Sequence, residues 1–227
     1  MASKHPKTHE NKRKLALFGK KKVPLSPRSA IAYNYNVAIF ASPMESLQGK
    51  LLIASPQMRD PNFHRSIVLI IRDDNDGAMG LVLNRPLELS ISEACEKVLE
   101  TPCEMEGYLH EGGPCEGPMM VLHAGDAYGE AIGDLEVLDG LWFITNKEEI
   151  ESLLAEPRDQ LKCFVGYAGW TDDQLAGEMD SGSWLIHPAT LDSVFSDDAR
   201  QWSKLMVQLT LRDQIDPRRI PDDPSVN

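Results

Sequence analysis

A cysteine flanked by two histidines is the group in this chain that comes nearest to a catalytic site. Cys115 lies in the segment His110–Pro118, and His123 follows shortly after it. A thiolate beside a base is the arrangement that nucleophilic catalysis needs. No third group can be named that would orient the base, no Gly-x-Ser-x-Gly elbow occurs, and His110 lacks the second histidine of a His-Glu-x-x-His zinc motif. The sequence therefore predicts no catalytic residue, and a cysteine hydrolase is the less favoured alternative.

Metal and phosphate motifs are incomplete in the same way. His64 and His123 have no His, Cys or carboxylate partner at ligand spacing. The acidic turn Asp73–Gly77 fits an EF-hand loop only in part, because Arg72 and Leu83 would occupy its first and last ligand positions. No glycine loop has the spacing of a dinucleotide or P-loop fingerprint. We therefore expect neither a metal nor a cofactor.

Residues at the ends of strands form the predicted binding patch. Asn84 and Arg85 close an apolar strand, where a side chain can face a cleft. Trp170 follows another strand and precedes Thr171, the expected start of a helix whose free N–H groups attract an anionic or polar ligand. His123 is expected to lie close to both. In the alternative reading, Arg85 pairs with a nearby acid and Trp170 fills the core.

The charge of the chain is divided unevenly along its length. Residues 1–28 hold nine Lys or Arg against Glu10 alone, a net charge of +8, so the total of -12 leaves -20 for the remainder. This acidic body should repel nucleic-acid phosphates, so we expect it not to bind nucleic acid directly. Residues 1–45 combine basic runs with prolines and are predicted to be a disordered arm. As an alternative, the runs Lys12–Lys14 and Lys20–Lys22 give the arm a nucleic-acid-binding or nuclear-import role.

Hydropathy predicts a soluble, cytoplasmic protein. No apolar run approaches the ~20 residues that span a bilayer, so no membrane association is expected. The segment Ala30–Ala41 follows a basic region as the core of a signal peptide would, but Asn34 and Asn36 interrupt it and no clear cleavage site follows. Secretion is therefore the less favoured reading. The same holds for an organellar transit peptide, because the first 28 residues are richer in Lys than in Arg and Ser.

The spacing of the four cysteines excludes zinc-ribbon and thioredoxin-like sites, because no Cys-x-x-Cys pair occurs. We expect reduced thiols. Cys95 lies on a helical apolar stripe and Cys163 on a strand alternation, so both are predicted to pack in the core. A disulfide between Cys103 and Cys115 is left open.

Short apolar segments bounded by turn residues predict seven strands. They are Lys50–Ala54, Ser66–Arg72, Leu81–Asn84, Met119–His123, Leu141–Ile144, Leu161–Tyr167 and Ser183–Ile186. Asp76-Gly77 between two of them predicts a hairpin, since glycine supplies the positive φ of a tight turn. These strands cluster in pairs between irregularly spaced helices, which favours an α+β fold over a doubly wound sheet. We expect a mixed, largely antiparallel sheet with helices packed around it, in a single domain over residues 46–227.

Four helices are predicted, three of them from capping boxes. The boxes pair Ser90 with Glu93, Thr145 with Glu148, and Thr171 with Gln174, and the first helix should end at Thr101-Pro102. The fourth helix follows Ser196 and carries an apolar stripe, formed by Phe195, Ala199, Trp202, Met206 and Leu209. This stripe predicts that the fourth helix faces the core.

Several short motifs together resemble the YqgE/AlgH family of bacterial proteins. They are Asp60-Pro61-Asn62-Phe63, Ser66-Ile67-Val68, Gly77-Ala78-Met79-Gly80 with Asn84 and Pro86, Gly112-Gly113-Pro114, Gly166-Tyr167-Ala168-Gly169-Trp170, Gln174-Leu175, Glu178, Trp184 and Pro188. The resemblance covers roughly Leu47 to Trp202. It implies a single cytosolic α+β domain with no agreed enzymatic activity, and one branch of the family is described as a transcriptional regulator. The basic arm and the tail Val207–Asn227 depart from the family pattern.

Two functions follow from these observations. The leading prediction is a non-enzymatic regulatory or interaction protein that acts through a protein partner and affects transcription only indirectly. The alternative is a small-molecule-binding protein or hydrolytic enzyme. Its site would lie near the hairpin Gly77–Pro86 and the loop Tyr167–Trp170.

Overall fold

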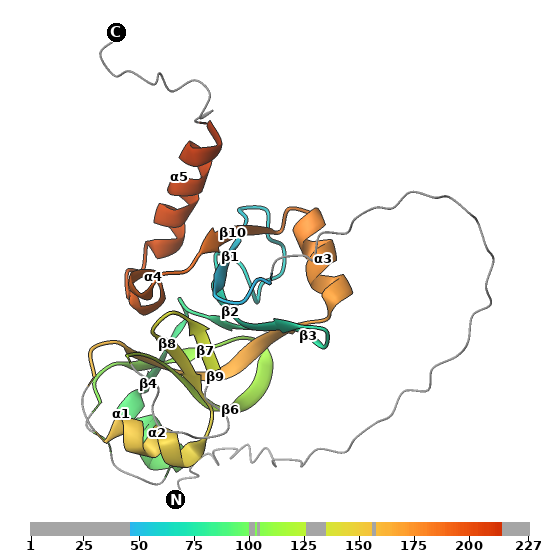
Figure 1. Ribbon diagram of the computed structural model, residues 1–227. Coiled ribbons are helices and arrows are strands. Elements are labelled where there is room, and N and C mark those ends of the chain that lie inside the picture. The colour runs from blue at the N-terminus through green and yellow to red at the C-terminus, as the bar shows by residue number, and fades with distance from the viewer. Residues whose placement is uncertain (1–45, 100–102, 104, 126–134, 156–157, 215–227) are drawn as a thin grey trace, which may run out of the picture. The chain divides into compact units, whose positions relative to one another are not determined.

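The computed structural model describes residues 46–99, 103, 105–125, 135–155 and 158–214 (Figure 1). The predicted basic arm, the expected helix end at Thr101-Pro102 and the last residues of the tail lie outside these ranges. Within them, none of the helices is long and apolar enough to cross a membrane.

The ten strands of the described residues form one sheet. They are β1 (Lys50–Ala54), β2 (Ile67–Asp74), β3 (Gly77–Val82), β4 (Pro86–Ser90), β5 (Tyr108–Glu111), β6 (Cys115–Ala124), β7 (Leu135–Leu138), β8 (Leu141–Ile144), β9 (Leu161–Trp170) and β10 (Trp184–Pro188). Their order is β10-β1-β2-β3-β9-β6-β8-β7, and the β4–β5 pair joins this path at β9. Only β5 and β9 run parallel; the other pairs are antiparallel. The predicted α+β class and mixed, largely antiparallel sheet are confirmed.

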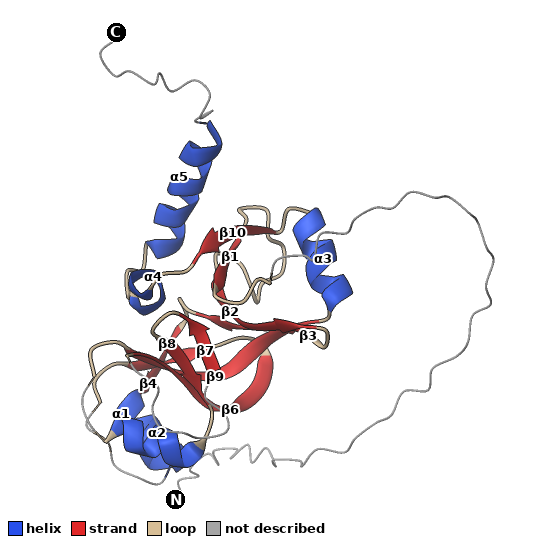
Figure 2. Ribbon diagram, viewed as in Figure 1, coloured by secondary structure: helices blue, strands red, loops and turns tan. Residues whose placement is uncertain are grey.

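Helices lie at separate places around the sheet (Figure 2). They are α1 (Ile91–Ala94), which continues as a π-helical turn over Cys95–Leu99, α2 (Lys147–Leu154), α3 (Asp172–Asp180), α4 (Leu191–Phe195) and α5 (Gln201–Gln214). One apolar cluster joins α2 and the π-helical turn over Cys95–Leu99 to β5, β6 and β9. The segment between β1 and β2 and the helix α3 share another with β1, β2 and β3.

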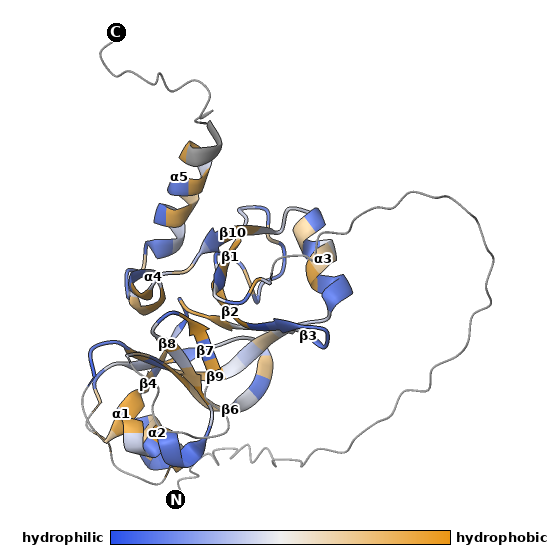
Figure 3. Cartoon of the chain, viewed as in Figure 1, coloured by the Kyte–Doolittle hydropathy of each residue, from blue (hydrophilic) through white to orange (hydrophobic). Residues whose placement is uncertain are grey.

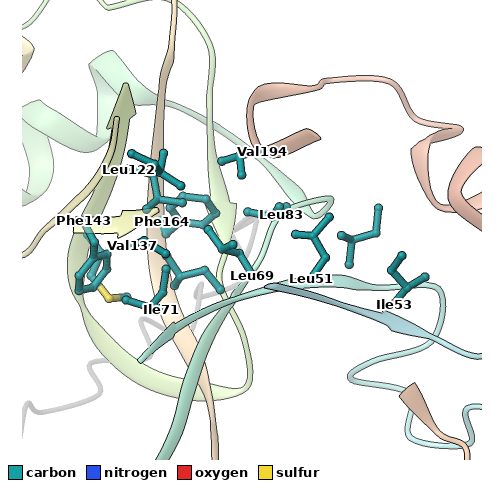
Figure 4. Packing of buried hydrophobic residues seen from close by; sticks show 14 of the residues in the cluster. Leu51, Ile53, Leu69, Ile71, Leu83, Leu122, Val137, Phe143, Phe164 and Val194 are labelled. Carbon is teal, nitrogen blue, oxygen red and sulfur yellow. The ribbon is translucent and has the colours of Figure 1, made fainter. Parts of the chain in front are cut away.

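The largest core lies where the sheet curls upon itself, so that β7 approaches β2. The Gln48 side chain donates to the carbonyl of Glu136 across this closure, 3.1 Å away. Seven strands contribute side chains to the interior, among them Leu51, Leu69 and Phe164, none of which has measurable exposure (Figure 4). Each such side chain contributes about 1.5–3 kcal/mol relative to its exposed state.

The predicted capping box at Ser90 is confirmed, whereas at Thr171 only the N-cap is, because the Gln174 side chain donates to Glu178. Ser90 and Glu93 cap each other's backbone N–H groups, and Thr171 accepts from Gln174 N at 3.3 Å. At α2 the predicted cap, Thr145, is wrong: Asn146 is the N-cap and accepts from Glu149 N at 3.0 Å. Asparagine ranks above threonine as an N-cap residue.

The predicted helix after Ser196 begins later than expected. Phe195 belongs to the separate helix α4, and Ser196 is extended, with φ -64° and ψ 130°. The predicted core-facing stripe is nevertheless confirmed from Trp202 onward, because Trp202, Met206 and Leu209 pack against the main core. The Trp202 indole also donates to the Ala54 carbonyl, 2.8 Å away.

Sequence patterns missed β4, β5 and β7 and most of β3. The strand predicted from Leu81 begins at Gly77, where the predicted hairpin is confirmed with Asp74 opposite Gly77. Gly77 and Gly80 weaken the sequence signal of this strand because they lack the β-branched or aromatic side chains that are enriched in strands. Both cysteines predicted to be in the core are buried, and all four thiols are free. The disulfide left open is therefore absent, and Cys103 Sγ instead lies 2.7 Å from Cys95 Sγ.

Candidate functional site

The five residues predicted to form one patch lie at three separate places. Trp170 is the last residue of β9 and pairs with Ala78 near the start of β3. Asn84 and Arg85 follow the other end of β3. His123 pairs with Leu161, the first residue of β9, so nine residues, or about 30 Å at ~3.3 Å per residue, separate it from Trp170 along the strand. The structure does not bring His123 together with the other four residues.

Asn84 and Arg85 hold the segment between β1 and β2. The Asn84 side chain accepts from Ile67 N and donates to the Arg65 carbonyl, each at 2.9 Å. Arg65 is the one non-glycine residue with positive φ (54°) among those described, so this amide fixes a strained turn. The Arg85 guanidinium donates to the Pro61 carbonyl at 3.4 Å and lies 4.0 Å from a Glu111 carboxylate oxygen. These contacts agree with the alternative reading of Arg85, in which it pairs with a nearby acid.

Trp170 belongs to a buried cluster of rings, which we call the aromatic cluster: Phe63, Trp170 and Trp184. The Phe63 ring centroid lies 5.6 Å from that of Trp170 and 5.3 Å from that of Trp184. One carboxylate oxygen of Glu178 accepts from both indoles, at 3.0 Å from Trp170 and 2.7 Å from Trp184. The other oxygen accepts from the Gln174 amide at 3.0 Å. Only 5% of Trp170 is exposed, so its ring fills the core.

A cleft of about 540 Å³ opens where the β2–β3 hairpin meets the end of β9, and we call it the hairpin cleft. Its floor is apolar, formed by Met79, Met120, Phe143 and Tyr167, and its edge is polar, formed by Arg72, Asp76, Thr145, Thr171 and Gln174. The hydrophilic tip of the hairpin is visible beside β3 in Figure 3. The cleft adjoins the hairpin and the Tyr167–Trp170 segment, where the alternative function placed its site.

A glycine in β9 places the floor of the cleft. Phe164 faces the main core and Tyr167 packs against the same core, although the two residues are three positions apart in the strand. Side chains two apart share a face in a regular strand, so the alternation must be interrupted between them. Gly166 has φ 72°, a conformation that favours glycine, and supplies this interruption. As a result, Tyr167 lies under the cleft, while Ala168 and Trp170 join the cluster on the other face.

The polar groups of the cleft are partly free to meet a ligand. Arg72 Nε lies 3.1 Å from a carboxylate oxygen of Asp74, but 58% of the arginine side chain is exposed. Among the hydrogen bonds of the described residues, none uses the Tyr167 hydroxyl. The exposed Gly169 lies beside Tyr167, and an added Cβ there would sit 3.4 Å from its ring. The cleft therefore offers a cation, a phenol and an open apolar floor.

Cys115 and His123 do not form a catalytic pair, because they lie far apart. Cys115 and His123 lie at opposite ends of β6, eight residues or about 26 Å apart along the strand. Burial raises the pKa of Cys95 to about 12, and burial also raises the pKa of Cys163. These two thiols are therefore protonated and poorly nucleophilic near neutral pH. Among the described residues, no group of three or more His, Cys, Asp or Glu could hold a metal.

Lys162 and His110 are charged or titratable groups inside the fold. Lys162 is 4% exposed; its ammonium donates to the Ser196 carbonyl at 2.9 Å and lies 3.1 Å from Asp197. Burial, and then the nearby Lys162 charge, lower the pKa of His110 from 6.5 to about 4. His110 is therefore neutral at pH 7, and its Nδ1 is buried without a hydrogen-bond partner among the described residues.

The lowered pKa of His110 predicts a loss of stability in acid. Because the unfolded chain binds this proton more readily, the free energy of unfolding should fall as the pH drops from about 6.5 towards 4, by on the order of 3 kcal/mol in total. Urea unfolding at a series of pH values measures this slope. His110→Gln, which cannot titrate, should remove that part of the slope. An identical slope in the variant would show that another group is responsible.

Some residues of these sites had no signal in the sequence beyond the family motifs. Glu178 joins two indoles that lie 8 and 6 positions away from it, spacings that no periodicity rule marks. Met79 and Met120 look like ordinary core residues, because only the curl of the sheet makes them neighbours. Gly169 belongs to the family motif Gly166–Trp170, but only the structure shows that it forms an open wall of the cleft.

Comparison with known proteins identifies the family. The AlgH-like family model matches residues 51–213. A UPF0301 protein of Chlorobaculum tepidum is 35% identical over 161 residues, which are 69% of this chain and 83% of that protein. A UPF0301 protein of Streptomyces avermitilis is 31% identical over 189 residues, 81% of this chain and 97% of that protein.

Solved structures show the same fold. The solution structure of the AlgH protein from Pseudomonas aeruginosa matches with a TM-score of 0.59 and 26% identity, over 82% of this chain and 98% of that one. A crystal structure of a Corynebacterium diphtheriae protein matches with a TM-score of 0.58 and 23% identity, over 72% and 87%. As the sequence motifs indicated, the chain belongs to the AlgH-like (UPF0301) family.

Proposed function

We propose that this protein is a non-enzymatic regulatory protein that binds a small amphipathic molecule in the hairpin cleft. The observation that carries the proposal is the cleft itself, which has about 540 Å³ of space, an apolar floor and a polar edge. This volume lies within the range of small-molecule sites, which combine mostly apolar walls with a few polar groups.

The lining favours binding over catalysis. It contains no cysteine or histidine, and its one carboxylate is Asp76. Methionine side chains such as Met79 and Met120 adapt to ligands of different shape. The lining therefore fits a molecule with a flat or acyl part over the methionines and a hydrogen-bond acceptor near Tyr167 and Arg72.

A regulatory role is supported by the family and by charge. The solved relative from Pseudomonas aeruginosa is named AlgH, and one branch of the family that this chain resembles is described as a transcriptional regulator. The net charge of -20 on residues 29–227 opposes direct contact with nucleic acid by the body of this chain, so in this proposal an effect on transcription is indirect. In this proposal the bound molecule changes the affinity for a protein partner in the cytoplasm.

A cleft-blocking variant tests the binding site. Gly169 is exposed, its φ lies outside the left-handed region, and Gly169→Val would place methyl groups over the Tyr167 ring. Purified protein is screened by thermal shift against metabolites, because a ligand at 100 times its Kd should add about 2.7 kcal/mol of apparent stability. We expect a compound that raises Tm in the parent protein and has little effect in Gly169→Val.

The matched control is Gly177→Ala in α3, where an added Cβ meets nothing within 4 Å. It should respond to the compound as the parent does and be more stable by about 0.5–1 kcal/mol, since alanine favours the helix. A compound that stabilises Gly169→Val as much as the parent binds elsewhere, and that result would contradict the proposal. The absence of any stabilising metabolite would favour a protein partner alone.

A further inference from the structure

A second cavity, of about 430 Å³, lies beside the C-terminal part of α3, and we call it the serine cavity. Its walls are the segment after β1 and the turn between α3 and β10. The residues that line it include Ser55, Met58, Phe63, Glu178, Ser181 and Ser183. The two cavities share no lining residue.

Ser55 points to a missing partner. The residue is 6% exposed, and its hydroxyl oxygen is buried without a hydrogen-bond partner among the described residues. Its backbone is well held, because Ser55 N donates to the Ser183 carbonyl at 2.9 Å. A buried hydroxyl without a partner costs about 1–3 kcal/mol. Such a group in a native fold calls for an explanation, and a ligand in the adjoining cavity supplies one.

The hydroxyl groups of Ser181 and Ser183 in the cavity each donate their one proton to a hydrogen bond within the protein. Ser181 Oγ donates to the backbone carbonyl of Glu178 at 2.9 Å. The 2.9 Å contact between Ser181 Oγ and Ser183 Oγ must then use the Ser183 proton, because Ser181 has no second one. Ser183 Oγ is thus left with only lone pairs to offer.

The Glu178 carboxylate is also an acceptor. Three N–H groups already bind it, from Trp170, Trp184 and Gln174. An ionised carboxylate accepts at about four positions, so one remains. The exposed Arg59 and Asp60 at the cavity carry opposite charges, which leaves Glu178 as the net charge of the lining.

We propose that the serine cavity binds a small primary ammonium group. The cavity offers acceptors on Glu178 and Ser183, together with Ser55, and a net negative charge. A primary ammonium has three N–H donors and no acceptor, so it complements this set where a carboxylate or phosphate would not. Charge-assisted hydrogen bonds of this kind are the strong ones. The acidic body adds an attractive field for a cation.

The test uses n-butylammonium as the probe, with n-butanol and butyrate as uncharged and anionic matches at equal ionic strength. The Met58 ε-methyl signal in a ¹³C-methionine NMR spectrum reports on the cavity, because Met58 lines it. We expect butylammonium to shift this signal saturably, with a Kd at least about tenfold lower than that of butanol. Butyrate should give no shift.

Substitutions separate a binding role from a structural one. Ser55→Ala should raise the Kd for butylammonium at least about tenfold, while the Tm does not fall, since it removes an unsatisfied hydroxyl. Ser152→Ala removes an exposed hydroxyl on α2 and should leave binding unchanged. Equal shifts with butanol and butylammonium, or unchanged binding in Ser55→Ala, would overturn the proposal. Neither result would bear on the hairpin cleft, because Met79 and Met120 report on that cleft separately.

Discussion

Gly112→Ala should prevent the protein from folding stably. The segment Gly112-Gly113-Pro114 connects β5 to β6, and its backbone lies directly on β9. An added Cβ at position 112 would overlap the carbonyl oxygen of Gly166 and sit 2.8 Å from Leu81 Cδ2. Gly112 cannot move away, because its N–H donates to Val165 at 2.9 Å and its carbonyl accepts from Val82 at 2.8 Å.

The expected loss from Gly112→Ala is about 4 kcal/mol or more, a large part of the 5–15 kcal/mol that holds a typical domain together. Urea unfolding, or the amount of soluble protein if the variant does not fold, measures it. Gly177→Ala is the matched control and should be slightly more stable than the parent. A Gly112→Ala protein within about 1 kcal/mol of the parent would show that the chain does not pass so close to β9.

Glu178→Ala should have the second-largest effect. It removes the shared acceptor of two indole N–H groups, and Trp170 and Trp184 are only 5% and 2% exposed. Each indole would keep a donor that neither protein nor bulk water can easily satisfy, at about 1–3 kcal/mol each. Loss of the charge-assisted bonds brings the expected destabilisation to about 3–5 kcal/mol. Thermal or urea unfolding, followed by tryptophan fluorescence, measures the change.

Glu178→Gln is the control that isolates the acceptor. Its amide oxygen can still accept from both indoles, and the exposed Gln174 amide can turn to accept from the new NH₂ group. This variant should lose about 1 kcal/mol, much less than the alanine variant. Equal losses in the two variants would mean that the charge of Glu178, rather than the shared hydrogen bonds, makes it important.

Local patterns predicted the fold class because its strongest signals are local. The strand cores β1, β2, β8 and β9 are runs of apolar residues, and the Ser90 and Thr171 caps have the spacing that the helix geometry requires. The strands β4, β5 and β7 are short and partly exposed, so their sequences carry little alternation. The Gly112-Gly113 connection approaches β9 closely, and this approach depends on residues more than fifty positions away in the sequence.

The candidate site was only partly predictable. The sequence indicated the hairpin and the Tyr167–Trp170 segment, which do border the cleft. It also grouped His123 with Trp170, because both stand at strand ends. Register decides which ends meet, and β9 carries His123 and Trp170 at opposite ends. No sequence pattern predicted the serine cavity, since its binding properties depend on which serine hydroxyls already donate hydrogen bonds in the folded chain.

Methionine ε-methyl NMR tests the central claim most directly. The protein is titrated with the compound that raises its Tm in the screen, while four methyl signals are followed. Met79 and Met120 line the hairpin cleft, Met58 lines the serine cavity, and Met179 packs against the apolar cluster that contains Phe63 of that cavity. Binding in the cleft predicts saturable shifts of Met79 and Met120 with Met58 and Met179 unchanged. Shifts confined to Met58 and Met179, or an unchanged Met79 and Met120 at saturation, would contradict it.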